Sequence, residues 1–302
     1  MADDSFDIPA GNEELAVHPT AFAPDLLRDK VVLISGGGSG MGRATAWLAA
    51  RLGAAVIVCG RNEEKLVAVV EAMRAADLDA DFEPLDIRER NAVERATETL
   101  WNRYGRIDLL INSAGGQFPQ AALDFSERGW NAVINTNLNG TWWMMQAHAR
   151  KWRELGGPGS IVNIVVVPRG LHGVAHTVAA RAGVVALSEA VSVEWAPYGI
   201  RVNCIAPGSI RTEGWAVYSP EARARYPKTN PLQTAGSPWQ IAEAAIFLGG
   251  PTGGFITGET LTIDGGGQHW GEIWTTDKPE YFREATRTLE ALSGPAPSEG
   301  PT

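Results

Sequence analysis

The feature that most constrains the fold is a cluster of glycines between a short apolar run and a helical pattern. Val31 to Ser35 is β-branched and apolar, as expected of a strand that is buried on both faces. Four of the next five residues are glycine, and Ala44, Leu48 and Leu52 follow at helical spacing. A strand, a glycine turn and a helix in this order point backbone N–H groups and the positive end of the helix at one place, where a pyrophosphate binds. The stretch therefore predicts a dinucleotide site.

Three of these glycines have separate expected roles. Gly36 permits the tight turn, Gly40 leaves no side chain facing the phosphates, and Gly42 allows the helix to pack closely on the strand. A glycine cluster alone is also typical of a flexible loop. The strand before it and the helix after it favour the binding site.

Apolar runs and helical patterns alternate along the rest of the chain. After the helix that follows the glycine turn, the sequence predicts helices at 62–76, 89–104, 130–155, 178–195 and 237–248, and strands at 31–35, 55–59, 81–85, 107–111, 161–167, 200–205 and 259–263. This alternation predicts an α/β fold: a single Rossmann domain with a doubly wound, seven-stranded parallel sheet and helices on both faces.

The two ends of the chain are expected to lie outside this domain, which should cover residues 30–267. Residues 1–29 form an arm without strong periodicity, attached to the body through Phe22, Leu26 and Leu27. Residues 268–302 form an extension with a helix at 279–292 and a last segment of disordered composition, GPAPSEGPT. That helix either docks on a neighbouring subunit or near the substrate entrance, or is loosely attached.

Composition excludes several classes of partner. The formal net charge is −9 and no basic run is present, which argues against a nucleic-acid partner. No apolar stretch approaches the ~20 residues that span a bilayer, and the acidic amino terminus lacks the apolar core of a signal peptide. Cys59 and Cys204 both lie in strand-like runs, as small buried side chains do, and no His or Cys cluster has metal-ligand spacing. We expect a cytoplasmic protein with no metal and no membrane partner.

Ordered motifs along the chain resemble those of the short-chain dehydrogenase/reductase family. They are SGGGSGMG in the glycine turn, NSAG from Asn112, Asn137 in NTNLNG, IRVNCIAPGSIRTEG from Ile200 and FITGETLTIDGGG from Phe255. The match extends from about Asp29 to Gly267. It implies a nicotinamide-dependent oxidoreductase that assembles as a homotetramer or homodimer.

The resemblance also implies a set of cofactor contacts. Arg61 follows Gly60 at the end of the second strand, where an arginine suits the 2′-phosphate of NADP and an acidic residue would suit NAD; the alternative is a solvated arginine at a helix start. Asp86 either meets the adenine edge or caps the next helix. The expected contacts are Ser35, Gly36, Ser39, Gly40, Met41, Gly42, Arg61, Asp86, Ile87, Asn112, Ala114, Gly115, Arg181, Pro207, Gly208, Ile210 and Thr212.

One part of the family pattern is missing. Members usually carry a serine after the fifth strand and a Tyr-x-x-x-Lys on the next helix, where the lysine lowers the pKa of the phenol for proton exchange. Here Val166 falls at the serine position, Thr177 at the tyrosine position and Arg181 at the lysine position. A threonine hydroxyl is too weak an acid to replace a phenol near neutral pH. Carbonyl reduction by the usual relay is therefore not expected.

Three functions remain open. GGQF, VNIVVVP and AHTVAARAGV resemble the peroxisomal trans-2-enoyl-CoA and 2,4-dienoyl-CoA reductase branch, whose members reduce a double bond conjugated to a thioester. Such a reaction requires stabilisation of negative charge on the oxygen more than a strong acid. The second is an alcohol dehydrogenase similar to the bacterial citronellol type, acting on a terpenoid-like or other hydrophobic alcohol through a substitute relay. The third is a cofactor-binding protein without turnover.

Four residues are the candidates for catalysis. Asn137 is expected at the active site, where the alternative is a structural asparagine in a kinked helix. Arg181 is expected to supply fixed positive charge, and Thr177 lies at the tyrosine position. His176 is either a proton donor in the cleft or a loop histidine bonded to backbone.

Residues 214–233 are expected to form a substrate lid. The segment carries the cations Arg223, Arg225 and Lys228 together with three aromatic residues, which would suit the phosphates and adenine of an acyl-CoA. An ordinary amphipathic surface helix is the alternative.

Overall fold

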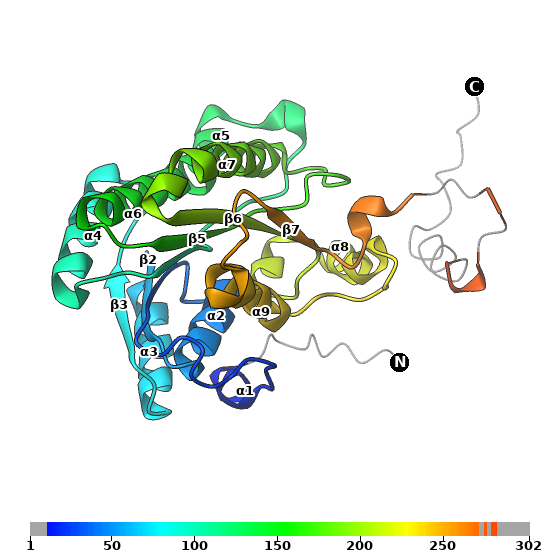
Figure 1. The fold of residues 1–302 in the computed structure, drawn as a ribbon. Coiled ribbons are helices and arrows are strands. Elements are labelled where there is room, and N and C mark those ends of the chain that lie inside the picture. Colours follow the sequence, from blue (N-terminus) through cyan, green and yellow to red (C-terminus); the bar gives the residue numbers. More distant parts are fainter. Residues whose placement is uncertain (1–10, 272–274, 277–278, 283–302) are drawn as a thin grey trace, which may run out of the picture.

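The middle layer of the molecule is a parallel β-sheet (Figure 1). The computed structural model describes residues 11–271, 275–276 and 279–282. The strand order is β3-β2-β1-β4-β5-β6-β7, and all neighbouring pairs are parallel. The strands are β1 (Val31–Ser35), β2 (Ala55–Gly60), β3 (Ala80–Pro84), β4 (Leu109–Asn112), β5 (Gly159–Ile164), β6 (Ile200–Pro207) and β7 (Thr260–Ile263). The predicted doubly wound, seven-stranded fold in one domain is confirmed.

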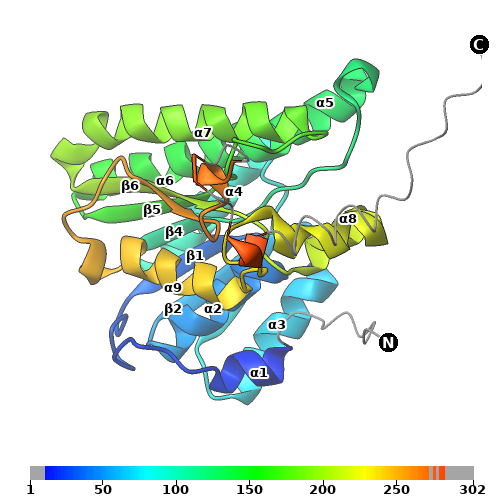
Figure 2. The same cartoon turned by 90° about the vertical axis from the view of Figure 1, so that its right-hand side faces the viewer.

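Helices cover both faces of the sheet, as Figure 2 shows. One face carries α2 (Gly40–Arg51), α3 (Glu63–Ala75) and α9 (Pro238–Gly249), and the other carries α4 (Arg90–Tyr104), α6 (Thr141–Leu155) and α7 (Ala175–Glu194). Alternate residues of β1 point to opposite faces. Val32 and Ile34 therefore pack in one core, whereas Val31 and Leu33 pack in the other. Burial on both faces is why this strand is apolar throughout.

The chain changes direction across the sheet between β1 and β4. From β1 it proceeds outward through β2 and β3, then crosses back to β4 on the other side of β1. Loops at the carboxyl ends of β1 and β4 therefore diverge and leave a crevice, where ligands bind in open α/β sheets. This crevice is the position of the predicted dinucleotide site.

The predicted helix at 130–155 is longer and contains an irregular turn. It begins with α5 (Glu127–Ile134), passes through a π-helical turn (Asn135–Gly140) and continues as α6. A π turn widens the helix by one residue and frequently marks a functional site. Here it includes Asn137, which is fully buried. Periodicity alone did not predict the turn, because apolar spacing before and after it remains helical.

Six of the seven strands differ from prediction at one or both ends, and β4 and β5 differ most. The expected 107–111 strand is β4, which begins at Leu109 and ends at Asn112. The expected 161–167 strand is β5, which ends at Ile164. Val165 still donates its N–H to Ile205 O (2.8 Å), and Pro168 then has no N–H to donate.

The described part of the arm packs onto the domain. Residues 12–17 form α1 (Asn12–Val17), whose Leu15 is buried, and Arg51 donates to Leu15 O (3.0 Å) and His18 O (2.7 Å). Leu27 is buried, and Phe22 and Leu26 are half-buried against the same core. Tertiary contacts hold a helix this short, which its own sequence does not predict.

Most of the carboxyl-terminal extension is not described. Of the helix expected at 279–292, residues 280–282 are helical, and Gln233 Nε2 donates to Tyr281 O at 3.2 Å. The remainder of that helix and the segment predicted to be disordered lie outside the described residues. Among the described residues, no helix is long and apolar enough to cross a membrane.

Candidate functional site

The glycine turn closes tightly between β1 and α2. Gly36 has φ +74°, and a Cβ built on it would lie 2.7 Å from the backbone N of Ala114. A Cβ on Gly42 would lie 2.4 Å from Gly36 O. Both distances are shorter than real Cβ contacts, so this packing of strand, turn and helix requires glycine at the two positions. The turn thus has the close approach predicted for a pyrophosphate site.

Beside the turn lies a cavity of about 210 Å³, here called the cofactor cavity. It is bounded by the glycine turn, the end of β2 and the loops after β3 and β4. Its lining residues are Gly36, Gly38, Ser39, Gly60, Arg61, Asn62, Lys65, Leu66, Leu85, Asp86, Ile87, Ala114, Gly115 and Thr136. Of the predicted contacts, Gly36, Ser39, Arg61, Asp86, Ile87, Ala114 and Gly115 are brought together here.

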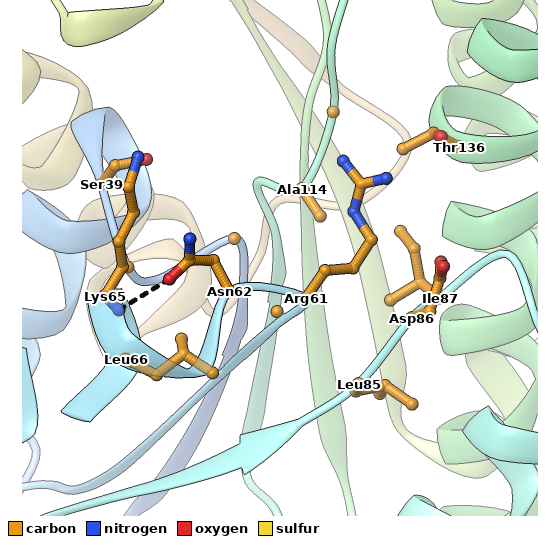
Figure 3. A pocket seen from close by; sticks show the side chains of 14 residues that line it. Ser39, Arg61, Asn62, Lys65, Leu66, Leu85, Asp86, Ile87, Ala114 and Thr136 are labelled. Carbon is orange, nitrogen blue, oxygen red and sulfur yellow. Dashed lines mark hydrogen bonds between the residues drawn. The ribbon is translucent and has the colours of Figure 1, made fainter.

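Two cations enter the cofactor cavity from the start of α3. Figure 3 shows the Arg61 side chain extending between Ala114 and Asp86, and the Lys65 side chain extending toward Ser39. Asn62 fixes the first turn of α3, because its Oδ1 accepts from Lys65 N at 2.9 Å. Sequence reasoning missed Lys65. Its signal was its place three residues after the N-cap Asn62, in the first turn of the helix that follows the second strand.

Asp86 lines the cavity with its carboxylate already bound. Arg88 Nε donates to Asp86 Oδ1 at 2.9 Å, and Arg88 N donates to the same oxygen at 3.1 Å. These hydrogen bonds from Arg88 hold the pKa of Asp86 below its ordinary value. The acidic group is therefore an ionised, fixed wall of the cavity.

Asn112 lies below the cavity and outside its lining. Ser35 Oγ donates to Asn112 Oδ1 (3.4 Å), Asn112 Nδ2 donates to Asn163 Oδ1 (2.9 Å), and Asn163 Nδ2 donates to Ser188 Oγ (2.9 Å). The ladder joins β1, β4 and β5 to α7. In this arrangement the Asn112 amide holds the strand ends in register, and its backbone leads into the Ala114–Gly115 wall.

Asn137 connects the loop after β4 to helix α7. Its Oδ1 accepts from Gly116 N (3.0 Å), and its Nδ2 donates to Gly116 O and to Thr177 Oγ1, each at 2.9 Å. Thr177 is fully buried. Thr141 Oγ1 donates to the Asn137 backbone O (3.0 Å), a carbonyl that the π turn exposes. The candidate residues Asn137 and Thr177 are therefore in direct contact.

Arg181 lies one helical turn beyond Thr177 and contacts the floor of the cofactor site. Its Nη1 donates to Ile164 O at the end of β5, and its Nη2 lies 2.0 Å from the place where a Gly115 Cβ would be. Burial lowers the pKa of Arg181 to about 10. The guanidinium is therefore still a cation at neutral pH, directly under the Gly115 wall.

His176 is enclosed by aromatic rings. Its ring centroid lies 4.7 Å from Phe118 and 4.5 Å from Phe125, and its Nδ1 accepts from Thr177 N at 2.7 Å. Burial lowers the pKa of His176, so the ring is neutral near pH 7. The geometry agrees with a histidine bonded to backbone, and His176 is not among the residues that line the cofactor cavity.

The segment that ends β6 and follows it carries four further predicted cofactor residues, of which Thr212 lies beside the glycine turn. Gly208 N donates to Ile263 O (2.9 Å) just after β6, and Ile210 is buried and bridges to Gly236. The Thr212 side chain lies 3.5 Å from the place where a Gly40 Cβ would be. Pro207, Met41 and Ser35 also lie outside the cavity lining.

Residues 213–229, which include most of the predicted lid (214–233), form three short turns and are here called the lid. The turns are η4 (Glu213–Val217), α8 (Pro220–Arg225) and η5 (Tyr226–Thr229). Tyr226 packs edge-on against Trp215 and Tyr218, each at 5.2 Å between centroids. Gln117 Nε2 donates to Tyr218 Oη, which joins the lid to the loop that Asn137 holds. Only the three-dimensional fold reveals this contact, because the two residues are far apart in sequence.

Comparison with known proteins identifies the family. The family model described as enoyl-(acyl carrier protein) reductase matches residues 36–268. The chain is a short-chain dehydrogenase/reductase. The resemblance of its motifs to that family is confirmed, and the enzyme is an NAD(P)-dependent oxidoreductase.

Individual relatives of this dehydrogenase/reductase carry different names. A probable 2,4-dienoyl-CoA reductase of Bacillus subtilis (strain 168) is 38% identical over 246 residues, covering 80% of this chain and 97% of the relative. A 3-oxoacyl-[acyl-carrier-protein] reductase of Chlamydia pneumoniae is 32% identical over 239 residues, covering 78% and 96%. The solved structure of a citronellol catabolism dehydrogenase from Pseudomonas aeruginosa PAO1 has a TM-score of 0.74 and 33% identity, covering 82% and 99%.

The described residues hold no group of three or more His, Cys, Asp or Glu side chains that could bind a metal ion. Cys59 and Cys204 are both buried and free.

Proposed function

We propose that this enzyme uses NADPH to reduce the carbon–carbon double bond of an enoyl- or dienoyl-thioester. The observation that carries the proposal is the pair on α7, Thr177 and Arg181. A buried threonine hydroxyl and a guanidinium that is charged at neutral pH stand where the family pattern has a phenol and a lysine. Neither side chain is a proton donor near pH 7. The pair suits a reaction in which the carbonyl oxygen is stabilised and the new hydrogen goes to carbon.

The cavity residues fit NADP. Gly36 and Gly42 allow the turn to pack tightly between β1 and α2, and Gly40 N lies at the start of α2, where helix N-termini bind phosphate. Arg61 and Lys65 supply two cations for a 2′-phosphate. Pro207, Gly208, Ile210 and Thr212 would hold the nicotinamide end. When bound, NADPH would supply the hydride to the conjugated alkene.

The residues of the chain itself would act by fixed charge and position. Arg181 would stabilise negative charge that develops on the thioester oxygen, without giving up a proton. Asn137 would keep the Gly115–Gly116 backbone and Thr177 in place through its hydrogen bonds. The buried surroundings of Arg181 strengthen the effect of its charge.

A second function has specific support. The Chlamydia and Pseudomonas relatives are named as a 3-oxoacyl-carrier reductase and a citronellol catabolism dehydrogenase. Carbonyl or alcohol chemistry in this chain would need a proton donor other than Thr177, and the enclosure of His176 by Phe118 and Phe125 argues against the histidine.

A substrate panel separates these functions. NADPH oxidation, followed by nicotinamide absorbance, would be measured with trans-2-enoyl-CoA, 2,4-dienoyl-CoA, 3-oxoacyl-CoA and a terpenoid aldehyde such as citronellal. We expect turnover with the first two alone. Turnover with 3-oxoacyl-CoA or the aldehyde alone would contradict the proposal and support the second function. Binding of NADPH with no turnover of any substrate would revive the hypothesis of a protein without catalysis.

We also propose a homo-oligomer. Trp142 on α6 stacks on Trp195, with 6.0 Å between the ring centroids. Both residues line a groove of about 290 Å³ between α6 and the end of α7. Aromatic and arginine side chains are enriched at protein interfaces, and Arg150 and Arg153 line this groove. Light scattering of the full chain tests the proposal, with a monomer as the contradicting result.

A further inference from the structure

The first residue of the lid binds the phosphate-binding turn. Glu213 begins η4, immediately after Thr212. Its Oε2 accepts from Gly40 N at 3.0 Å, and its Oε1 lies 3.0 Å from Nη2 of Arg43. The carboxylate therefore bridges the first residue of α2 and a cation one turn further along the helix.

This contact uses the donors that a cofactor phosphate needs. The start of α2 presents N–H groups that have no partner within the helix and a partial positive charge, and Ser39 at the N-cap makes no side-chain capping bond. An anionic oxygen is the natural partner at such a position. A carboxylate oxygen 3.0 Å from Gly40 N and a phosphate oxygen on the same N–H cannot be present together.

We propose that Glu213 and the cofactor pyrophosphate are alternative ligands of Gly40 N–H and Arg43. Cofactor binding then displaces the carboxylate and detaches the start of the lid from the turn. This inference rests on the proposed NADPH site and extends it: Glu213 lowers affinity for the cofactor and couples its binding to movement of η4.

The lid is attached at a second point, which limits the movement. Trp215 is 8% exposed and packs on Tyr226, and Tyr218 Oη accepts from Gln117 Nε2. Release of Glu213 therefore frees residues next to Thr212 first, while the aromatic cluster stays packed. Since Thr212 is the expected neighbour of the nicotinamide, the displaced segment lies at the reacting end of the cofactor.

The test compares Glu213→Gln with a matched variant, Glu221→Gln. Both substitutions remove one negative charge from the lid, but the exposed Glu221 lies on α8, away from the turn. NADPH affinity would be measured by fluorescence titration, and amide hydrogen exchange would be followed in peptides covering 36–43 and 213–217. Inorganic pyrophosphate would serve as a second, smaller probe of the same donors.

We expect Glu213→Gln to lower the Kd for NADPH about tenfold, as suits the loss of one competing charged hydrogen bond. Without cofactor, its 213–217 peptide should exchange faster than wild type. With saturating NADPH the two proteins should exchange alike, because the contact is then absent from both. Pyrophosphate should accelerate exchange of this peptide in the wild type, and Glu221→Gln should behave as wild type throughout.

An unchanged Kd and unchanged exchange in Glu213→Gln would overturn the inference, as would equal effects of the two variants. These readouts need no thioester. A tighter Kd without thioester turnover would preserve the inference and contradict the proposed reaction. Thioester turnover with no effect of Glu213→Gln on the Kd or on exchange would support the proposed reaction and overturn the inference.

Discussion

The glycine turn and the Arg181 centre form two halves of one site, and they are built in different ways. The turn depends on backbone: its distinctive feature is that a Cβ on Gly42 would lie 2.4 Å from Gly36 O. The Arg181 centre depends on individual side chains. The Arg181 guanidinium donates to Ile164 O, and the Asn137 amide donates to Gly116 O and to Thr177 Oγ1. A turn whose backbone leaves no room for a Cβ tolerates no substitution of its glycines, whereas side chains at fixed positions can be exchanged for others with different chemistry.

Our proposals divide along this difference. Our proposed reaction depends on Thr177 and Arg181 of α7, whereas cofactor binding depends on the turn. The two halves should therefore fail separately when they are mutated.

The largest effect is expected at the turn. In Gly42→Val the side chain would meet Gly36 O, so α2 would have to move away from β1. We expect NADPH Kd to rise by about 100-fold or more, equivalent to at least ~2.7 kcal/mol. Fluorescence titration gives the Kd, and near-UV circular dichroism reports whether the domain still packs. If Val disrupts folding, Gly42→Ala provides the milder variant.

Gly157→Ala is the control for this substitution, because a Cβ there meets nothing within 4 Å. It should bind NADPH as the wild type does. A folded Gly42→Val protein with wild-type affinity would show that the turn does not bind the cofactor.

Arg181→Met tests the other half. Methionine keeps much of the apolar volume and removes the charge, so stabilisation of the oxygen is lost. We expect kcat/KM for an enoyl thioester to fall about 100-fold, whereas NADPH Kd should change by less than about fivefold. Arg181→Lys should recover part of the rate, because it restores a cation.

Arg128→Met, at an exposed position on α5, is the matched control and should leave both quantities unchanged. If Arg181→Met weakened NADPH binding as much as it slowed the reaction, Arg181 would belong to the cofactor half, and the division proposed here would be wrong.

Arg61 and Lys65 test selectivity within the cofactor half. Arg61→Ala and Lys65→Ala should each raise NADPH Kd about tenfold, as expected for one charge-assisted contact. NADH lacks the 2′-phosphate, so its Kd in the same proteins should stay within about twofold and serves as the internal control. Equal weakening of both cofactors would place these cations at a site other than the 2′-phosphate.

Features of the fold that depend on local sequence could be predicted, and features that depend on contacts between residues far apart in the sequence could not. The seven strands could be predicted because β-branched runs such as Val31 to Ser35 are buried on both faces wherever they lie in a parallel sheet. The π turn at Asn137, the short helix α1 and the Glu213 contact could not. Each is stabilised by residues distant in sequence: Thr177, Arg51 and Gly40 respectively. Local patterns carry no record of such partners.

The last prediction concerns the core, where His148 on α6 accepts from Trp101 Nε1 at 3.0 Å. Burial lowers the pKa of His148 from 6.5 to about 3. Below pH 6.5 the unfolded chain therefore binds a proton that the folded chain does not, and the free energy of unfolding falls as pH decreases from 6.5 toward 3. We expect a loss of about 1.4 kcal/mol per pH unit from this group.

Urea unfolding between pH 4.5 and 7.5 measures that slope. In His148→Gln the amide oxygen can still accept from Trp101, and the slope should be smaller by about 1.4 kcal/mol per pH unit below pH 6.5. His172→Gln, at an exposed position, should keep the wild-type slope. Because Arg181 stays charged and His176 stays neutral near pH 7, the catalytic rate should be flat there. If activity is lost in acid over the same pH range as the folded structure, the cause is unfolding of the core. If activity is lost at a pH well above that range, the cause is a group that titrates at the Arg181 centre.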